Sequence, residues 1–209
     1  MKIIEPSVEL VQDLNPAEIM KHIERAGRVC YKSESNISDT SAEKFIANII
    51  KSGHESVIEH VSITFKIICD RGVSHEIVRH RLASYSQESS RYCDYSGNKF
   101  GGELTFIKPC YWNEDDENYL MWRQAMAILE HLYLSMRDKG ARPEQARSIL
   151  PNSLKTELFM TANLREWRHF LKLRTSKKAH PQMREVAIKI YEILNEKLPV
   201  IFSDIEIED

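Results

Sequence analysis

The residues best suited to chemistry lie in one stretch, from Arg79 to Tyr92. Its sequence is Arg-His-Arg-Leu-Ala-Ser-Tyr-Ser-Gln-Glu-Ser-Ser-Arg-Tyr, with three arginines, one histidine, four serines and only two aliphatic side chains in fourteen residues. Arginine presents a rigid fork of donors that matches phosphate oxygens two at a time, and serine hydroxyls can fill the remaining acceptor positions. This composition suits neither a core helix nor a half-buried strand, so we expect a surface that binds an anion together with a polar ring. The alternative for the same stretch is a solvated helix end.

A second polar segment, Gly-His-Glu-Ser-Val-Ile-Glu-His, covers residues 53–60 and contains two histidines. His54 and His60 are six residues apart, and their spacing matches none of the usual metal-ligand patterns. We therefore expect no metal site.

The four cysteines, at positions 30, 69, 93 and 110, are widely spaced and form no C-x-x-C pair. This spacing excludes a zinc ribbon and a thioredoxin-like motif. We expect buried or idle thiols in a reducing compartment, and none of them has an obviously activating neighbour.

Length and charge restrict the class of protein. A chain of 209 residues with seven glycines, seven prolines and no Ser/Gly-rich linker predicts a single domain over residues 1–209. The net charge of −2 argues against a surface built throughout for nucleic acid. The N-terminus lacks the apolar run of a signal peptide, and no stretch approaches the roughly 20 apolar residues of a membrane span. We expect a cytoplasmic protein with neither a membrane nor a nucleic-acid partner.

Hydrophobic periodicity and capping residues predict the elements that must position these side chains. Strands are expected at 2–12 with a break at Pro6, 61–69, 104–107 and 154–162. Helices are expected at 16–30, 40–53, 73–79, 113–139, 143–150 and 163–174, and from Pro181 onward. Strands interspersed with helices, without regular β-α-β alternation or a Gly-x-Gly-x-x-Gly turn, predict an α+β domain with a central, mostly antiparallel sheet flanked by long helices, not a Rossmann fold.

Several helix ends carry specific signals. Asn15 and Asn163 are expected to cap the helices that follow them. Thr40 and Glu43 are expected to form a capping box, and Gly53 to end that helix in a left-handed conformation. The helix over 113–139 is expected to begin with a cluster of acidic residues and to bury an apolar stripe. The chain is expected to leave the helical conformation near Arg79, because Arg79 and Arg81 would diverge on a continuing helix.

The spacing Arg-His-Arg, two residues, Ser84, four residues, Ser89, one residue, Arg91 resembles the signature of the flavin-dependent thymidylate synthases. That family methylates deoxyuridine monophosphate (dUMP) with a flavin instead of a protein cysteine. Four further segments resemble motifs of the same family: Gly-His-Glu-Ser-x-x-Glu-His at 53–60, Ala-Arg-x-x-Leu-Pro at 146–151, Asn-x-Arg at 163–165 and Phe-Leu-x-Leu-Arg at 170–174. The resemblance extends from about Gly53 to Arg184.

The resemblance implies two binding sites and one catalytic residue. The residues implied for FAD are Ser56, Arg79, His80, Arg81, Gln87, Asn163, Arg165 and His169. Those implied for dUMP are Glu76, Arg79, Gln87, Glu88, Ser89, Ser90, Arg91, Arg147 and Arg174. Arg174 would also be catalytic, as a fixed positive charge that stabilises the anionic uracil ring. The resemblance further implies 5,10-methylenetetrahydrofolate as one-carbon donor, NADPH to re-reduce the flavin, and a homotetramer with active sites between subunits.

The sequence departs from the commoner family pattern in four places. Glu76 stands where a glutamine is also found, Gln87 where a glutamate is frequent, and His169 where an asparagine is frequent. Residues 177–184 replace a histidine followed by an Ala-Gln-Trp-Glu-like run, which leaves the contact at Lys178 open. We expect Ser89 to position the substrate, because no histidine or lysine at a matching place would deprotonate it.

Two other functions fit part of the sequence. A single-strand nucleic-acid-binding module could stack bases on Tyr85 and Tyr92, although the negative charge and the lack of a second basic-aromatic stretch argue against it. A flavoprotein reductase with another substrate would share the flavin residues and differ at Arg91, Arg147 and Arg174.

Overall fold

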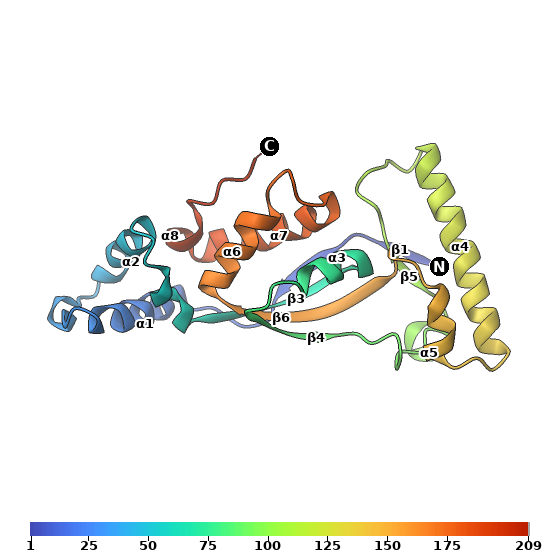
Figure 1. The fold of residues 1–209 in the computed structure, drawn as a ribbon, viewed down its shortest axis with the longest axis horizontal. Helices are drawn as coiled ribbons and strands as arrows, with labels where there is room; N and C mark the ends of the chain where they lie inside the picture. Colours follow the sequence, from blue (N-terminus) through green and yellow to red (C-terminus); the bar gives the residue numbers. More distant parts are fainter. Residues whose placement is uncertain (209) are drawn as a thin grey trace. The chain divides into compact units, whose positions relative to one another are not determined.

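The strands of the computed structural model, which describes residues 1–208, form two sheets (Figure 1). The smaller sheet pairs β1 (Lys2–Ile4) in parallel with β5 (Thr105–Ile107), so that Lys2 lies opposite Thr105. The larger sheet is antiparallel and has the order β2-β3-β6-β4. Its strands are β2 (Ser7–Leu10), β3 (Ser62–Asp70), β6 (Lys155–Asn163) and β4 (Ala83–Gln87). The expected mixture of helices with a mostly antiparallel sheet is confirmed.

Helices make up the larger part of the remaining structure. The α-helices are α1 (Pro16–Val29), α2 (Ser41–Lys51), α3 (Arg71–Ile77), α4 (Glu117–Asp138), α5 (Pro143–Ala146), α6 (Leu164–Arg174), α7 (Pro181–Lys197) and α8 (Pro199–Phe202). Short 3₁₀ turns are η1 (Glu34–Asn36), η2 (Glu55–His60), η3 (Asn98–Phe100) and η4 (Arg147–Ile149). Within residues 1–208, none of the helices combines the length and the hydrophobicity that a membrane crossing requires.

The chain forms two compact units. The first unit comprises residues 1–7, 67–79 and 86–158, and the second comprises residues 8–66, 80–85 and the chain from Phe159 onward. The chain passes from one unit to the other within β2, β3, β4 and β6, and once more between Arg79 and His80. The expectation of a single domain over residues 1–209 stays a prediction.

Each unit has its own apolar core. In the first unit, β5 and α4 contribute to a buried cluster of Tyr95, Leu104, Phe106, Met126, Tyr133, Ala146 and Leu154. In the second unit the indole of Trp167 lies edge-on to both Phe65 and Phe170, with ring centroids 5.2 and 5.5 Å away. Its Nε1–H donates to the carbonyl of Ile63 at 3.0 Å, which satisfies the polar atom of a fully buried ring. This core holds α6 against β3.

Several local predictions are confirmed. The side chain of Asn15 accepts from the backbone N–H of Glu18, and the side chain of Asn163 accepts from that of Glu166. Gly53 adopts a φ of +69°, the left-handed conformation that a glycine takes at a helix end without steric cost. Helix α3 ends at Ile77, before Arg79, as expected.

Other local predictions are wrong. Thr40 precedes α2 but makes no side-chain capping bond, so the expected capping box is absent. Helix α4 begins at Glu117 because the carboxylate of Asp116 accepts from the N–H of Asn118 at 2.7 Å, which leaves the preceding acidic residues outside the helix. Helix α8 was not expected at all.

The largest correction concerns the Arg79–Tyr92 stretch. Residues 83–87 form β4, in which half-buried and exposed residues alternate, although the composition argued against a half-buried strand. The strand is polar on both faces because it lies at the edge of the larger sheet. Just beyond it, the N–H of Glu88 donates to the carbonyl of Glu157 at 2.8 Å. Backbone pairing, and not apolar side chains, therefore makes this segment a strand.

Candidate functional site

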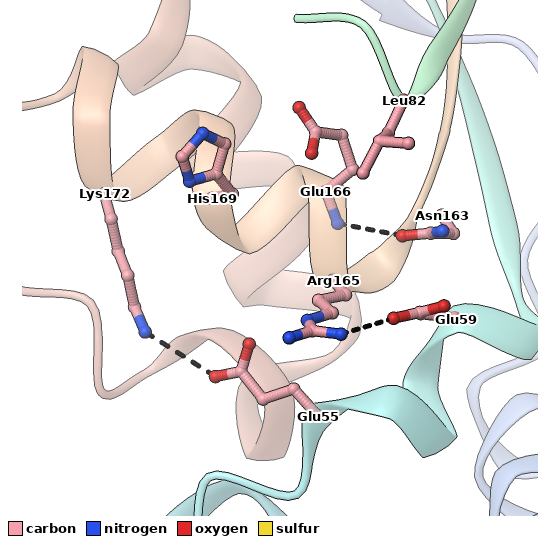
Figure 2. Close-up of a pocket in the computed structure, with 8 residues that line it drawn as sticks. All are labelled: Glu55, Glu59, Leu82, Asn163, Arg165, Glu166, His169 and Lys172. Atoms are coloured by element: carbon pink, nitrogen blue, oxygen red, sulfur yellow. Dashed lines mark hydrogen bonds and ion pairs between the residues drawn. The ribbon is translucent and has the colours of Figure 1, made fainter.

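A cavity of about 590 Å³ lies in the second unit (Figure 2). Its lining is almost entirely polar and comes from η2, from α6 with its cap, and from the segment before β4: Glu55, Glu59, Leu82, Asn163, Arg165, Glu166, His169 and Lys172. Figure 2 shows Arg165 directed at Glu59 and Lys172 directed at Glu55, with N···O distances of 2.6 and 3.6 Å. Both cations are about half exposed, so they remain accessible to an anionic ligand.

Helix α6 positions these side chains through its amphipathic spacing. Arg165, His169 and Lys172 recur at intervals of three and four residues and therefore share one face. Trp167 and Phe170 lie on the buried side of the same helix. The cap by Asn163 fixes where the helix begins, and with it the register of the whole cavity face.

Beside this cavity, three charged or polar side chains of the second unit form a hydrogen-bonded chain. His80 is only 4% exposed, and its Nδ1 lies 3.0 Å from Oε1 of Glu166. Its other ring nitrogen, Nε2, accepts a hydrogen bond from Nε of Arg174 at 3.1 Å. Burial lowers the pKa of His80 and the Arg174 charge lowers it further, while the Glu166 carboxylate opposes both effects.

The same region includes a possible metal-binding group. Ligand atoms of His80, Glu166 and His169 all lie within 4.8 Å of one another. However, both nitrogens of His80 already have hydrogen-bond partners, and one of these is the cationic Arg174. A cation would have to displace Arg174 or the contact with Glu166, so the geometry favours the hydrogen-bonded chain over a metal centre.

A smaller cavity of about 270 Å³ lies in the first unit. Three basic side chains line it, those of Arg71, His75 and Arg147, together with the hydroxyl-bearing residues Ser90 and Ser148. Nη1 of Arg147 donates to Oγ of Ser90 at 3.5 Å. Two guanidinium groups with nearby hydroxyls form a donor set that suits a phosphate or another small anion.

A buried polar network supports this cavity. The hydroxyl of Thr156, which is fully buried, accepts from Nη1 of Arg71 at 3.3 Å and from Nε2 of Gln87 at 3.2 Å. Gln87 also donates to the hydroxyl of buried Ser74 at 3.0 Å. Both amide hydrogens of Gln87 are therefore directed at hydroxyl groups inside the first unit, which ties the end of β4 to α3 and β6.

Glu88 is turned toward the protein interior. Its carboxylate accepts from the hydroxyl of Tyr95 at 2.6 Å and from Nζ of Lys155 at 2.7 Å. Burial raises the pKa of Tyr95, and the adjacent Glu88 carboxylate raises it further. In this arrangement Glu88 holds the start of the loop after β4, and Tyr95 stays protonated as the donor.

The structure brings together part of the predicted FAD set. Asn163, Arg165 and His169 line the cavity in the second unit, and His80 lies in the hydrogen-bonded chain beside it. Ser56 instead lines a separate cavity of about 250 Å³, with Tyr31, Phe45 and His54 among its neighbours. Arg79 and Arg81 are exposed, and neither lines any of these cavities in the described part of the chain.

The predicted dUMP set divides in a similar way. Ser90 and Arg147 line the cavity in the first unit. Gln87 shares the Thr156 hydroxyl with the lining residue Arg71, and the carbonyl of Glu88 accepts from Arg71. Arg91 lies elsewhere, with its Nε 3.3 Å from the Glu144 carboxylate and its guanidinium over the Tyr92 ring. Glu76 and Ser89 are half-buried and do not line the described cavity, and Arg174 belongs to the second unit.

Sequence reasoning missed several residues of these sites. Arg71, His75, Lys172 and Glu166 all take part, and none was singled out. In the sequence, Glu166 is an ordinary acid in the first turn of a capped helix, and only its burial in the structure shows that it needs a partner. The pairing with His80, 86 residues away, is not visible in any local pattern.

Comparison with known proteins identifies the family. The family model described as "Thymidylate synthase complementing protein" matches residues 9–200. The chain belongs to this family. The resemblance found in its motifs is thereby confirmed.

Individual relatives agree with this assignment. A flavin-dependent thymidylate synthase of Pyrococcus furiosus is 41% identical over 162 residues, which cover 77% of this chain and 66% of the relative. One of Geobacter sulfurreducens is 34% identical over 186 residues, which cover 86% of this chain and 78% of that relative. The match thus spans just under two thirds of the length of the Pyrococcus furiosus relative.

The fold is also that of a solved structure. The UMP/dUMP methylase PolB from Streptomyces cacaoi, bound with 5-Br dUMP, superposes with a TM-score of 0.78. The two sequences are 26% identical, and the match covers 97% of this chain and 96% of that protein.

Proposed function

We propose that this chain catalyses the reductive methylation of dUMP to dTMP, with FAD as its flavin, 5,10-methylenetetrahydrofolate as one-carbon donor and NADPH as reductant of the flavin. The observation that carries the proposal is the hydrogen bond from Arg174 to buried His80. Arg174 ends the Phe-Leu-x-Leu-Arg segment, whose resemblance to the family implies an arginine that activates the uracil. Family membership and the names of the relatives support the same reaction.

Activation of the uracil is the role proposed for Arg174. Methylation requires electron density at uracil C5 and an electron-poor C6. Because of the electron density at C5, the ring carries negative charge in the transition state. A guanidinium beside N3 and O2 stabilises that charge most effectively when it is oriented before the substrate arrives. The hydrogen bond from Nε of Arg174 to His80 supplies such an orientation.

Binding of the nucleotide phosphate is the role proposed for Arg147 and Ser90, with Arg71 and His75 as additional donors. These residues surround one cavity, and Arg147 already donates to the Ser90 hydroxyl. A phosphate would replace that weak 3.5 Å contact with charge-assisted hydrogen bonds. The proposal keeps Gln87, Glu88, Ser89, Arg91, Glu76 and Arg79 as further contacts or supports of the nucleotide.

The residues around the larger cavity fit a flavin dinucleotide. Arg165 and Lys172 offer accessible cations for the diphosphate, and Asn163 and His169 offer polar groups beside them. Before binding, Arg165 is paired with Glu59, so the ligand must compete with that carboxylate. When bound, the reduced flavin supplies the hydride of the reductive methylation. We propose Ser56, Arg79, His80, Arg81 and Gln87 as the remaining flavin residues.

The proposed reaction needs no cysteine nucleophile, and the thiols of this chain agree with that. Cys69 is fully buried, and burial raises its pKa far above that of an exposed thiol, which disfavours the thiolate. Within residues 1–208, Cys30, Cys93 and Cys110 form no disulfide. Cysteines without disulfides suit the proposed cytoplasmic location.

We further propose a homotetramer with active sites between subunits. Exposed apolar side chains along α4 support association of copies, namely Leu120, Met121, Ile128 and Leu132. Static light scattering gives the mass directly. A monomer of 24.4 kDa in solution would contradict this part of the proposal.

The first test is the visible absorption spectrum of the purified protein before and after addition of dUMP. We expect flavin bands near one per chain that dUMP perturbs, followed by dTMP formation that depends on both methylenetetrahydrofolate and NADPH. A protein that neither contains nor takes up flavin would overturn the proposal. Flavin-dependent NADPH oxidation without dTMP formation would point instead to a reductase with another substrate.

A further inference from the structure

Glu166, His80 and Arg174 form a continuous chain of hydrogen bonds in the second unit. Glu166 is 6% exposed and His80 4% exposed, so water hardly reaches the two bonds of the imidazole. Glu166 and Arg174 lie at opposite ends of α6, and the His80 ring bridges them by its two nitrogens. Nothing in the family motifs assigns Glu166 a role.

The chemistry of the partners determines which nitrogen of His80 carries the proton. Arg174 has only N–H donors, so Nε2 of His80 must offer a lone pair to accept its bond. A neutral imidazole with a bare Nε2 carries its hydrogen on Nδ1. That Nδ1–H faces Oε1 of Glu166 at 3.0 Å, and an ionised carboxylate is purely an acceptor. Donors and acceptors alternate correctly along the chain in this one tautomer.

We propose that Glu166 is a positioning residue, which selects the Nδ1–H tautomer of His80 so that Nε2 accepts from Arg174 and fixes the direction of its guanidinium. The proposal deepens the proposed function, on which its catalytic consequence rests. Its structural content concerns the tautomer alone.

The surroundings hold each member of the chain in place. The backbone N–H of Glu166 donates to the cap Asn163 at 2.8 Å, which anchors the first turn of α6. The hydroxyl of Tyr85 donates to the carbonyl of His80 at 2.6 Å. The ring of Phe170 meets the imidazole edge-on, with centroids 4.8 Å apart. Backbone, ring face and both ring nitrogens of His80 are therefore all constrained.

The charges around His80 shift its pKa in opposite directions, so the proposal can be tested by titration. Three titratable groups that face His80 lie on α6: Glu166, His169 and Arg174. A fourth, Tyr85, lies in β4 just after His80, and burial raises the pKa of Tyr85 to about 12. The Glu166 carboxylate raises the pKa of His80, whereas burial, Arg174 and His169 lower it. Removal of the Glu166 charge should lower the pKa of His80, and removal of the Arg174 charge should raise it.

The direct test is long-range ¹H–¹⁵N NMR of the flavin-free and flavin-loaded protein labelled at histidine. Eight histidines contribute, and loss of one signal in His80→Asn assigns His80. We expect the Nδ1–H tautomer in the wild type at neutral pH. An Nε2–H tautomer or a charged imidazole there would overturn the proposal without any variant.

Two isosteric variants complete the test. Glu166→Gln should shift the titration of His80 to lower pH and reduce the preference for one tautomer. Glu24→Gln is the matched control, because Glu24 is 1% exposed in the same unit but bonds Arg28 and Ser41 instead. It should leave the His80 spectrum unchanged. A Glu166→Gln spectrum identical to wild type would contradict the proposed role of Glu166.

Kinetics then connect the tautomer with catalysis. Glu166→Gln should lower kcat for dTMP formation roughly 10-fold with little change in KM for dUMP, since outer partners that orient a histidine typically have effects of this size. The acid limb of the kcat profile should move to lower pH together with the His80 titration. If no dTMP forms in any protein, the proposed function fails while the NMR result still decides the tautomer. An unchanged kcat with an altered tautomer would overturn the catalytic consequence.

Discussion

The two units hold their key arginines in different ways. In the second unit, Arg174 donates to buried His80, which is itself bound to buried Glu166. In the first unit, Arg147 is exposed and donates to Ser90 over 3.5 Å, in a cavity that Arg71 and His75 also line. The hydrogen bonds in the second unit fix the direction of the Arg174 guanidinium, whereas the cavity in the first unit collects positive charge.

This difference matches the two tasks that we propose. A phosphate spreads its charge over several oxygens and accepts donors from many directions, so the sum of nearby positive charge matters most. Charge that develops on a uracil ring appears at defined atoms, and only a correctly aimed donor stabilises it. If direction matters in the second unit and charge in the first, substitutions of the two arginines should have different consequences.

The largest effect is expected from Arg174→Ala. Loss of a preorganised group that faces transition-state charge should lower kcat for dTMP formation roughly 10²–10³-fold. Arg174→Lys keeps the charge but loses the fixed planar guanidinium, so we expect it to restore little. Steady-state assays at saturating dUMP give kcat directly. A Lys variant with near wild-type kcat would show that charge alone suffices.

Arg147 should behave in the opposite way. Arg147→Ala should raise KM for dUMP about 10-fold or more and change kcat less, because a phosphate contact contributes equally before and during the reaction. Arg147→Lys should recover much of the affinity, since the remaining cations of the cavity complete the charge. The measurement is KM for dUMP, or dissociation of dUMP followed by flavin absorbance. If Arg147→Lys lost as much affinity for dUMP as Arg147→Ala, binding at this site too would depend on the orientation of the guanidinium.

The network under the first-unit cavity should contribute to stability. Thr156→Val keeps the shape of the side chain but removes the hydroxyl that accepts from both Arg71 and Gln87. Two half-buried donors would then each lose one acceptor, although Arg71 keeps the carbonyl of Glu88 and Gln87 keeps the hydroxyl of Ser74, so we expect a cost of about 1 kcal/mol in the free energy of unfolding. Thermal or urea unfolding measures this loss of stability. Thr161→Val is a control in the second unit, because Thr161 is only part-buried and shares a hydroxyl contact with Thr64; we expect a smaller loss there.

Local sequence patterns predicted the framework of both units well. The caps at Asn15 and Asn163, the strand over 61–69 and the helix end at Gly53 all rest on contacts within a few residues. The same reasoning failed for β4, whose stability as a strand comes from backbone pairing at a sheet edge. It also failed for the start of α4, where several adjacent acids offered equivalent caps and only Asp116 caps the helix.

The candidate sites were predictable in their residue types but not in their partnerships. The bond from Arg174 to His80 joins residues 94 positions apart, and the contact of Arg165 with Glu59 spans 106. No periodicity encodes such pairs, because they depend on how strands and helices pack after each has formed. Motif resemblance named His80, Arg165 and Arg174 individually, while their pairing with Glu166 and Glu59 is visible only in the folded chain.

The smallest effect is expected from the exposed ion pair at the mouth of the second-unit cavity. Glu59→Gln removes the carboxylate that lies 2.6 Å from Arg165. Both side chains are about half exposed, so solvent screens the pair and the variant should unfold like the wild type. Flavin affinity should rise slightly, because the flavin diphosphate no longer competes with Glu59 for Arg165, and the gain should shrink as salt increases. Titration of flavin-free protein with FAD at low and high salt tests this. Weaker flavin binding in Glu59→Gln would mean that Glu59 orients Arg165 for its ligand. Both proposed ligand contacts of the second unit, Arg165 for the flavin and Arg174 for the uracil, would then depend on an oriented guanidinium.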